Sequence, residues 1–312
     1  MINIVKYSSE KRNEWNKFLY ESKNGLFLFD RDYMEYHSDR FVDFSLMIYK
    51  RDELITLLPA NIEENVFVSH GGLTFGGFIS NSRMTVSEML MIFGETINYL
   101  KIHSIGKIVY KCIPYIYHLI PAEEDRYALF RNEARLFRRD VTSTIYLQKK
   151  LSFQKLRCRS IKKAVSAILK VKKVDDFKSY WNILEANLAK MHNTKPVHSL
   201  EEIKYLYSKF PDNIKLFASY QDNTILAGVV IYESTNVAHA QYIASSEKGR
   251  EIGALDMIFS FLVNEYYQNK KYFDFGISTE NKGIYLNKGL IFFKEGFGAR
   301  AVVHDFYEVN IK

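Results

Sequence analysis

Short hydrophobic runs, rich in β-branched and aromatic residues, dominate the last hundred positions of the chain. They lie at 214–220, 224–233 and 237–245, and the pairs Asp222-Asn223 and Thr235-Asn236 between them are typical of tight turns. Strands joined by tight turns pair with their neighbours in antiparallel fashion. The pattern therefore predicts a three-stranded antiparallel meander.

A helical pattern follows this meander, because Leu255, Ile258 and Leu262 recur at the spacing of one helix face. The turn that leads into it contains Gly249 and Gly253, and glycine lets another group approach the backbone closely. The first N–H groups of a helix lack partners, and the helix dipole adds positive charge there, so this turn suits a phosphate group. A further strand, a second helix and a closing strand are predicted after it.

The first half of the chain repeats this order of elements. A strand, a helix, a three-stranded meander, a helix, a strand, a helix and a closing strand are predicted at 2–7, 10–20, 43–70, 85–101, 107–113, 123–131 and 136–147. Repetition of the order indicates two similar domains. We therefore expect one domain at residues 1–150 and another at 151–312, with a linker near 149–159.

Two motifs in the second half resemble a known superfamily. Arg250 and Gly253 resemble the Gln/Arg-x-x-Gly-x-Gly/Ala signature of the GNAT-type N-acetyltransferase fold, although Ala254 lies one place before the final small residue. The strings YFDFGISTEN at 272–281 and LIFFKEGFGA at 290–299 resemble the Fem-type branch of that superfamily. In that branch a strand ending in a Gly-Ile/Val-Ser turn leads into a helix that closes on Lys-x-Gly-Phe-Gly. The resemblance covers roughly residues 150 to 312.

The resemblance implies a fold and an activity. The fold is α/β (α+β), with tandem GNAT-like acyl-CoA N-acyltransferase domains, each a mixed, mostly antiparallel sheet flanked by helices, and with substrates held between the halves. The activity is transfer of an acyl group from acyl-CoA to an amino group of a sugar or sugar nucleotide in surface-polysaccharide or cell-envelope biosynthesis. Two alternatives stay open: a Fem-type peptidyltransferase that uses aminoacyl-tRNA, and a non-catalytic glycan-binding or scaffold protein with a degenerate donor site.

The resemblance places the acyl-CoA donor in the second domain. In the GNAT-type fold the donor arm pairs with a fourth strand that splays away from its neighbour, and this strand maps to residues 241–245. We therefore expect the donor to be held by the end of that strand and the glycine-bearing turn, namely Ile243, Ala244, Gly249, Arg250, Gly253 and Ala254. The structural alternative is a plain turn entering a helix.

The candidate catalytic residues follow the next predicted strand. Ser278 and Glu280 lie where that strand ends, and Glu280 is the first candidate for the general base. The alternative is a helix start capped by Ser278 or Thr279, with the acid in the first turn. The general acid of many acetyltransferases falls on Phe292 by one alignment and on Tyr285 by another. Phenylalanine donates no proton, so Tyr285 is the candidate acid, and the spacing leaves both alignments open.

Four residues are candidates for holding the acceptor. The resemblance to polysaccharide-associated Fem-like proteins includes the string SHGGLTFGG, and it implies an acceptor role for His70. The others are Lys294 in the Lys-Glu-Gly-Phe-Gly turn, Arg157 in a basic helix, and His198 in a loop between two helices. Structural alternatives are a glycine-rich loop for His70, a cation at a helix C-terminus for Lys294 and a solvated helix face for Arg157.

Positive charge is concentrated in one stretch. Residues 149–173 contain ten Lys or Arg and no Asp or Glu, whereas the whole chain has a net charge of +7. Such a stretch attracts anions, so we expect an anionic small-molecule or glycan acceptor, with peripheral contact to an anionic membrane as another candidate. The tRNA partner is less favoured, because Fem-type enzymes that use it often carry a long coiled-coil arm. Only short helices are predicted here, at 177–190 and 200–209.

Composition and the lengths of apolar runs narrow the classes of protein to which the chain can belong. The chain has 312 residues, 47% of them hydrophobic and 25% charged, which is ordinary for a soluble globular protein. No run approaches the roughly 18 apolar residues of a membrane span, and residues 1–15 mix charges unlike a secretory signal, so we expect a cytoplasmic protein. No histidine or cysteine pair has metal-ligand spacing, so we expect no metal cofactor. Cys112 and Cys158 lack a neighbouring histidine, which favours direct attack without an acyl-enzyme.

Overall fold

The chain folds into two compact units. The computed structural model describes residues 1–311, except for the side chains of residues 191 and 192. Unit 1 comprises residues 1–140, 281–284 and those from 303 onward, and unit 2 comprises residues 141–280 and 285–302. Strands β9 (Arg135–Tyr146) and β17 (Arg300–Asn310) therefore contribute residues to both units. The chain first passes from unit 1 to unit 2 within β9, after residue 140, and the residues from 303 onward belong to unit 1.

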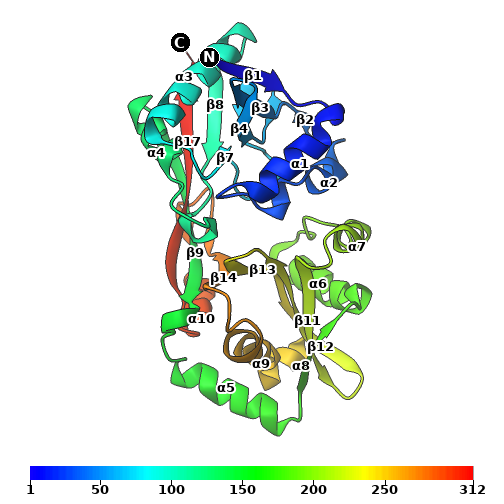
Figure 1. The fold of residues 1–312 in the computed structure, drawn as a ribbon. Helices are drawn as coiled ribbons and strands as arrows, with labels where there is room; N and C mark the ends of the chain where they lie inside the picture. Colours follow the sequence, from blue (N-terminus) through cyan, green and yellow to red (C-terminus); the bar gives the residue numbers. More distant parts are fainter. Residues whose placement is uncertain (312) are drawn as a thin grey trace. The chain divides into compact units, whose positions relative to one another are not determined.

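Unit 2 is a mixed sheet with helices on both faces (Figure 1). Its sheet has the order β10-β11-β12-β13-β14-β9. The strands are β10 (Lys170–Val174), β11 (Ile214–Gln221), β12 (Thr224–Glu233), β13 (Val237–Ser245) and β14 (Tyr272–Ile277), followed by the short hairpin β15 (Thr279–Glu280) and β16 (Tyr285–Leu286). The helices are α5 (Lys155–Ser166), α6 (Phe177–His192), α7 (Leu200–Lys209), α8 (Glu247–Ile252), α9 (Ala254–Phe261) and α10 (Lys288–Glu295). The predicted meander is confirmed, because β11, β12 and β13 pair in antiparallel register.

The core of unit 2 lies between the sheet and α9. Ile258 and Leu262 of the predicted apolar stripe are buried in this core, and Leu255 packs against it. The ring of Phe259, also buried, lies 4.8 Å from the Phe275 ring of β14. Helix α5 packs on α9, whereas α6 packs against β12 and β13. Gly228 of β12 permits this second contact, because a Cβ there would come within 2.4 Å of the Tyr180 ring of α6. The two faces of the sheet are therefore covered by different helices.

Unit 1 contains two sheets (Figure 1). One has the order β1-β3-β4-β7, formed by β1 (Ile2–Lys6), β3 (Leu46–Lys50), β4 (Glu53–Leu58) and β7 (Ile79–Ser80). The other runs β17-β8-β6-β5-β2, with β8 (Lys107–Lys111), β6 (Val66–Val68), β5 (Asn61–Glu63) and β2 (Val42–Asp43). Its main helices are α1 (Arg12–Glu21), α2 (Arg31–Met34), α3 (Val86–Ile102) and α4 (Glu124–Arg131).

The second meander was predicted as one antiparallel sheet, and this prediction is wrong. Within the meander predicted at 43–70, residues 53–63 are divided into β4 and β5, which belong to different sheets. Pro59 lies between them, and proline has no N–H group with which to continue a strand ladder. The chain therefore changes sheet at this point.

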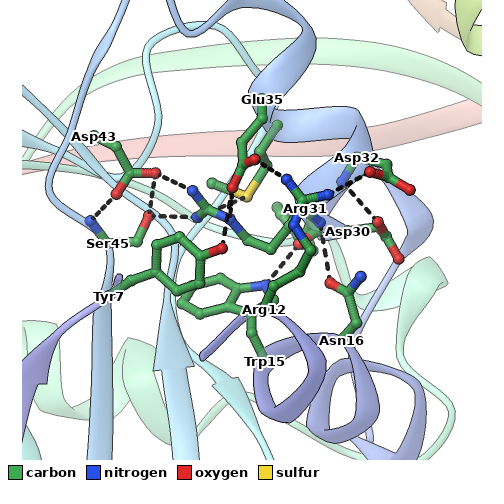
Figure 2. A network of polar contacts seen from close by, with 12 residues as sticks. Tyr7, Arg12, Trp15, Asn16, Asp30, Arg31, Asp32, Glu35, Asp43 and Ser45 are labelled. Atoms are coloured by element: carbon green, nitrogen blue, oxygen red, sulfur yellow. Dashed lines mark hydrogen bonds and ion pairs between the residues drawn. The ribbon is translucent and has the colours of Figure 1, made fainter. Parts of the chain in front are cut away.

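A buried arginine organises the first helices of unit 1 (Figure 2). Arg31 is 2% exposed and forms ion pairs with Glu35 at 3.0 Å and Asp43 at 2.5 Å. Its guanidinium also lies 3.6 Å from the centre of the Tyr7 ring. The Trp15 indole donates a hydrogen bond of 2.8 Å to the backbone carbonyl of residue 29. The buried guanidinium thus has two carboxylates and an aromatic ring as partners, and a buried charge without such partners would be costly.

Candidate functional site

The central strands of unit 2 separate part-way along their length. Strands β13 and β14 are parallel, and in the described chain they pair only from Val237–His239 to Tyr272–Asp274. Beyond His239, β13 continues to Ser245 along β12 alone. Alternate residues of an edge strand direct their N–H and C=O groups away from the neighbour that they keep. The predicted splay is therefore present, and it leaves backbone groups of β13 open to an extended ligand.

A cavity of about 550 Å³ lies in unit 2 beside the open part of β13. It is lined by Arg157, Ser160, Leu184, Asn187, Leu188, Ile243, Ser245, Gly249, Arg250, Gly253, Ala254, Leu255, Asp256, Leu290 and Phe293. Five of the six residues predicted to hold the donor are in this set. The sixth, Ala244, is buried and pairs with Gly228 of β12. The splayed strand and the glycine-bearing turn thus share one cavity.

The glycine-bearing turn differs from the open phosphate-binding turn that was expected. Residues 247–252 form the helical turn α8, whose N-terminus is capped by the Ser246 hydroxyl, which accepts a hydrogen bond of 3.0 Å from the Gly249 N–H. The N–H of Arg250 also bonds within this turn, to the Ser246 carbonyl. Gly253 then has φ +82°, and a Cβ there would lie 2.5 Å from the carbonyl oxygen of Ser160 in α5. Glycine is therefore needed at this position.

The Arg250 side chain joins three walls of the cavity. Its guanidinium donates hydrogen bonds of 2.9 Å to the Asn187 side-chain carbonyl and 3.0 Å to the Ser245 backbone carbonyl. Asn187 in turn donates its amide to the same Ser245 oxygen at 2.9 Å. These bonds link α8, α6 and the end of β13, so Arg250 holds the shape of the cavity.

A buried ion pair lies at the N-terminus of α9. Asp256, in the first turn of α9, lies 2.9 Å from the Arg157 guanidinium of α5, and both residues line the cavity. Arg157 also lies over the Phe293 ring, 4.9 Å from its centre. Burial raises the pKa of the Asp256 carboxyl, and the nearby Arg157 charge opposes that rise. A carboxylate therefore already occupies the helix end that was expected to attract a phosphate.

A second group of polar side chains lies where β13 and β14 part. His239 and Asp274 form the last paired position of the two strands, and Thr142 and Thr144 of β9 lie beside Asp274. Asp274 is fully buried and accepts hydrogen bonds from His239 Nδ1 at 2.7 Å, from Thr144 Oγ1 at 2.8 Å and from Thr142 Oγ1. We name these four residues the fork cluster.

The fork cluster holds its histidine in one orientation. A carboxylate only accepts hydrogen bonds, so Nδ1 carries the proton and Nε2 keeps its lone pair. In the described part of the chain, His239 Nε2 has no hydrogen-bond partner, and the His239 side chain is 16% exposed. Gly276, at φ +76°, faces the ring, since a Cβ there would lie 3.4 Å from His239 Cε1.

Comparison with known proteins reveals the fold. No family model matches this chain, and no curated protein matches its sequence. The crystal structure of FemX matches 97% of this chain and 96% of its own, with a TM-score of 0.69 at 10% identity. The C-terminal domain of a candidate lysylphosphatidylglycerol synthetase from Agrobacterium fabrum matches 97% of this chain and 92% of its own, with a TM-score of 0.64 at 11% identity.

A third solved structure is a tandem GNAT protein from the clavulanic acid biosynthesis pathway. It matches 100% of this chain and 99% of its own, with a TM-score of 0.52 at 6% identity. All three similarities extend over nearly the whole chain. This chain has a Fem-type fold of tandem GNAT-like domains.

The three predicted catalytic residues lie after β14 and are not part of the cavity lining described above. Glu280 is exposed on β15, where its carboxylate accepts a hydrogen bond of 2.8 Å from the Asn287 side-chain amide. Tyr285, 53% exposed, lies opposite it on β16. Ser278 is buried, and its hydroxyl has no hydrogen-bond partner among the described residues. Their catalytic roles remain predictions.

The structural alternative for Glu280, a place in the first turn of a helix capped by Ser278 or Thr279, is wrong. Residues 279–286 form the hairpin β15–β16, and α10 begins only after Asn287, whose side chain caps it by accepting from the Leu290 N–H. Asn281 and Lys282 have φ values of +49° and +54°, which turn the chain back on itself. A Cβ at Gly283 would lie 2.2 Å from the Arg139 carbonyl oxygen, so the hairpin is packed closely on β9.

Two of the predicted acceptor residues in unit 2 are buried. Lys294 donates hydrogen bonds of 2.8 Å and 2.7 Å to the carbonyls of Gly276 and Ile277, and burial lowers its pKa to about 8. His198 Nδ1 lies 2.5 Å from the Tyr242 hydroxyl. Lys294 therefore braces the end of β14, directly beside the fork cluster. Arg157 is the predicted acceptor residue that lines the cavity.

The glycine-rich loop of unit 1 is folded over a buried lysine. Lys111 of β8 donates hydrogen bonds to the carbonyls of His70, Gly71 and Leu73 at 2.8, 3.2 and 2.6 Å. The His70 ring is buried and stacks on His37 with centres 5.5 Å apart, and burial lowers the His70 pKa to about 3. These contacts match the structural alternative for the loop, and acceptor binding by His70 remains a prediction.

Among the side chains that the structure describes, no group of three or more His, Cys, Asp or Glu residues is arranged to hold a metal ion. Within the same residues, none of the helices combines the length and the apolar character that crossing a bilayer requires.

Proposed function

We propose that this chain is an acyltransferase that moves an acyl group from a carrier to an amine, with the carrier arm lying along the open part of β13. The observation that carries the proposal is the separation of β13 and β14 next to a cavity of about 550 Å³. An extended arm in that gap would pair with the unpaired backbone groups of β13, as an added strand does. An N–H group of β13 would polarise the acyl carbonyl.

The first candidate reaction uses acyl-CoA and an amino sugar or sugar nucleotide, in surface-polysaccharide or cell-envelope biosynthesis. Apolar residues such as Ile243, Leu290 and Phe293 give the cavity a lining suited to a thioester arm. An anionic acceptor is supported by α5, whose exposed face carries basic residues and no acid. Those residues are Lys155, Arg159, Lys162 and Lys163.

The second candidate reaction uses an aminoacyl donor, such as aminoacyl-tRNA. Two observations favour it: α8 uses its own N–H groups, and Asp256 places a carboxylate at the start of α9, where it repels a pyrophosphate. A neighbour in fold is named for a lysyl-lipid product, lysylphosphatidylglycerol. Both candidates share the same chemistry, attack of an amine on an activated carbonyl at the gap.

Calorimetric titration of the purified chain with acetyl-CoA, and separately with a pool of charged tRNA, tests the proposal. We expect one of the two to bind at micromolar concentration. Leu290→Trp, which fills part of the cavity, should weaken that binding at least tenfold. Leu286→Trp is the matched control, because Leu286 has similar exposure (40% against 38%) and is outside the cavity lining. Absence of binding by both donors would instead support a non-catalytic glycan-binding protein.

A further inference from the structure

The fork cluster is placed on one face of the sheet by the alternation of its strands. Ala238 and Ala240 of β13, Phe273 and Phe275 of β14, and Ile145 of β9 all belong to the core beneath α9. His239 and Asp274 lie between these residues in sequence, and Thr144 lies next to Ile145. Successive side chains of a strand point to opposite faces. Three strands therefore direct polar groups to the face that is turned away from α9.

The cluster is built around one buried carboxylate. Asp274 receives three hydrogen bonds, from His239, Thr142 and Thr144, and each of those groups donates. Hydrogen bonds to the charged form of an acid favour that form. The ammonium of Lys294 lies near enough to Asp274 for the two charges to attract. Asp274 is therefore an anion that fixes the tautomer of His239 and would stabilise its protonated ring.

The histidine lies at the end of the gap. His239 and Asp274 are the final paired residues before the strands part, so an acyl arm that follows β13 towards the fork ends beside them. Ile243, which lines the cavity, is four residues further along β13, roughly 13 Å for an extended strand. A donor arm that extends along β13 from the cavity would therefore end at His239.

We propose that His239 is the general base of the acyl transfer and that Asp274 is the residue that positions it. The proposal rests on the acyltransferase function inferred above. The acceptor amine attacks the acyl carbon, and His239 Nε2 takes the proton that the nitrogen loses. The C–N bond forms and the C–S bond of a thioester, or the C–O bond of an ester, breaks. The imidazolium then gives its proton to the departing sulfur or oxygen, so the enzyme returns to its starting state.

The arrangement also explains Gly276. A side chain at this position would point towards His239, and its Cβ would lie 3.4 Å from the ring carbon next to Nε2. Glycine leaves that side of the ring uncovered. Lys294 holds the same loop in place through the carbonyls of Gly276 and Ile277. The loop after β14 therefore keeps an approach to His239 open.

The test uses the full chain with acetyl-CoA or charged tRNA as donor and a panel of glucosamine and nucleotide-linked amino sugars as acceptors. We expect His239→Gln to lower kcat at least 100-fold while the donor KM changes less than about threefold. His239→Ala should regain activity when imidazole is added. His103→Gln is the control, since His103 is an exposed histidine of unit 1, and it should leave turnover unchanged.

Asp274→Asn tests the positioning role. Without the carboxylate, His239 Nδ1 loses the acceptor that fixes the tautomer of the ring, so kcat should fall while the donor KM stays within about threefold of wild type. If this buried variant does not fold, Thr144→Val removes one hydrogen bond that holds the carboxylate in place and should lower kcat by less, again with little change in the donor KM.

The outcomes separate two failures. Turnover by His239→Gln within threefold of wild type would overturn the assignment of the base and leave the acyltransferase function standing. Failure of the wild-type chain to release coenzyme A or free tRNA from either donor would overturn the acyltransferase function, and the role of His239 with it.

Discussion

Each unit contains a cluster of polar side chains around one buried charged residue. The two clusters differ in whether the partners of that residue have hydrogen-bonding atoms left unpaired. In unit 1, Arg31 is 2% exposed and is bounded by Glu35, Asp43 and the Tyr7 ring (Figure 2). In unit 2, Asp274 is equally buried, yet its partner His239 keeps Nε2 without a hydrogen bond in the described chain.

The difference indicates different roles. A closed network stabilises the packing of its elements, because its buried polar atoms have protein partners in place of water. A ring nitrogen such as His239 Nε2, which is held in one orientation but makes no hydrogen bond in the described chain, adds little to stability and is available to accept a proton. We therefore expect substitutions in the Arg31 network to affect folding, and substitutions at His239 to affect turnover.

The largest effect is expected at Arg31. Arg31→Ala leaves Asp43 without its cation and Glu35 with Arg12 as its remaining cation, and it removes the guanidinium that packs on the Tyr7 ring. The free energy of unfolding should fall by about 3–5 kcal/mol. Urea denaturation of Arg31→Ala and His239→Gln in parallel measures the contrast. A loss of stability in His239→Gln as large as that in Arg31→Ala would remove the distinction between the two groups.

Lys294 should give the next largest effect. Burial lowers its pKa from 10.5 to about 8, so folding disfavours the charged ammonium. The free-energy cost of burying the ammonium has its full value below pH 8, where the lysine is protonated in both the folded and the unfolded chain. This cost disappears as the pH rises to 10.5. Wild-type stability should therefore gain roughly 3 kcal/mol relative to Lys294→Met between pH 8 and 10.5.

The same measurement compares the two units. Lys111 in unit 1 also donates to loop carbonyls, and burial lowers its pKa to about 8 as well. Lys111→Met should therefore change the pH dependence of unfolding in the same direction. A constant difference between wild type and Lys294→Met across this pH range would show that Lys294 keeps an ordinary pKa in the folded chain.

Gly253 should give a smaller effect. Gly253→Ala strains a residue at φ +82° and brings its Cβ to 2.5 Å from the Ser160 carbonyl oxygen, so we expect a loss of about 1–3 kcal/mol and weaker donor binding. Gly94→Ala is the control in unit 1. Gly94 lies inside α3 with nothing within 4 Å of the added Cβ, and alanine there should stabilise the chain by up to about 1 kcal/mol. Equal effects of the two substitutions would contradict the close packing at Gly253.

The parts of the fold that depend on local sequence could be predicted. The meander of β11, β12 and β13 follows from alternating hydrophobic residues and two turn-forming pairs, and its strands lie where the pattern places them. The turn that lines the cavity could be predicted from Arg250 and Gly253, because glycine marks a position where the backbone is approached closely or takes a conformation that other residues avoid. The capping box of α7, formed by Ser199 and Glu202, is likewise a local feature, because it depends on two residues three positions apart.

The parts that depend on contacts distant in sequence could not be predicted. His239 and Asp274 are 35 residues apart, and only the parallel register of β13 and β14 brings them together. The hairpin at 279–286 depends on Gly283 packing against β9, so the local sequence suggested a helix start instead. Lys111 offers no local signal, because its role is defined by loop carbonyls about 40 residues earlier.

The smallest effect on stability, but the most informative for the donor, is expected at Asp256. Asp256→Asn keeps the size of the side chain and removes the negative charge at the start of α9, while Arg157 retains its contact with the Phe293 ring. If the donor carries a pyrophosphate, its repulsion by Asp256 disappears, and the affinity for acetyl-CoA measured by calorimetry should rise severalfold. If Asp256 instead pairs with the ammonium of an aminoacyl group, the affinity for charged tRNA should fall by a similar factor. An unchanged affinity for both donors would mean that neither ligand reaches this end of the cavity, and the position of the donor would have to be sought along β13 alone.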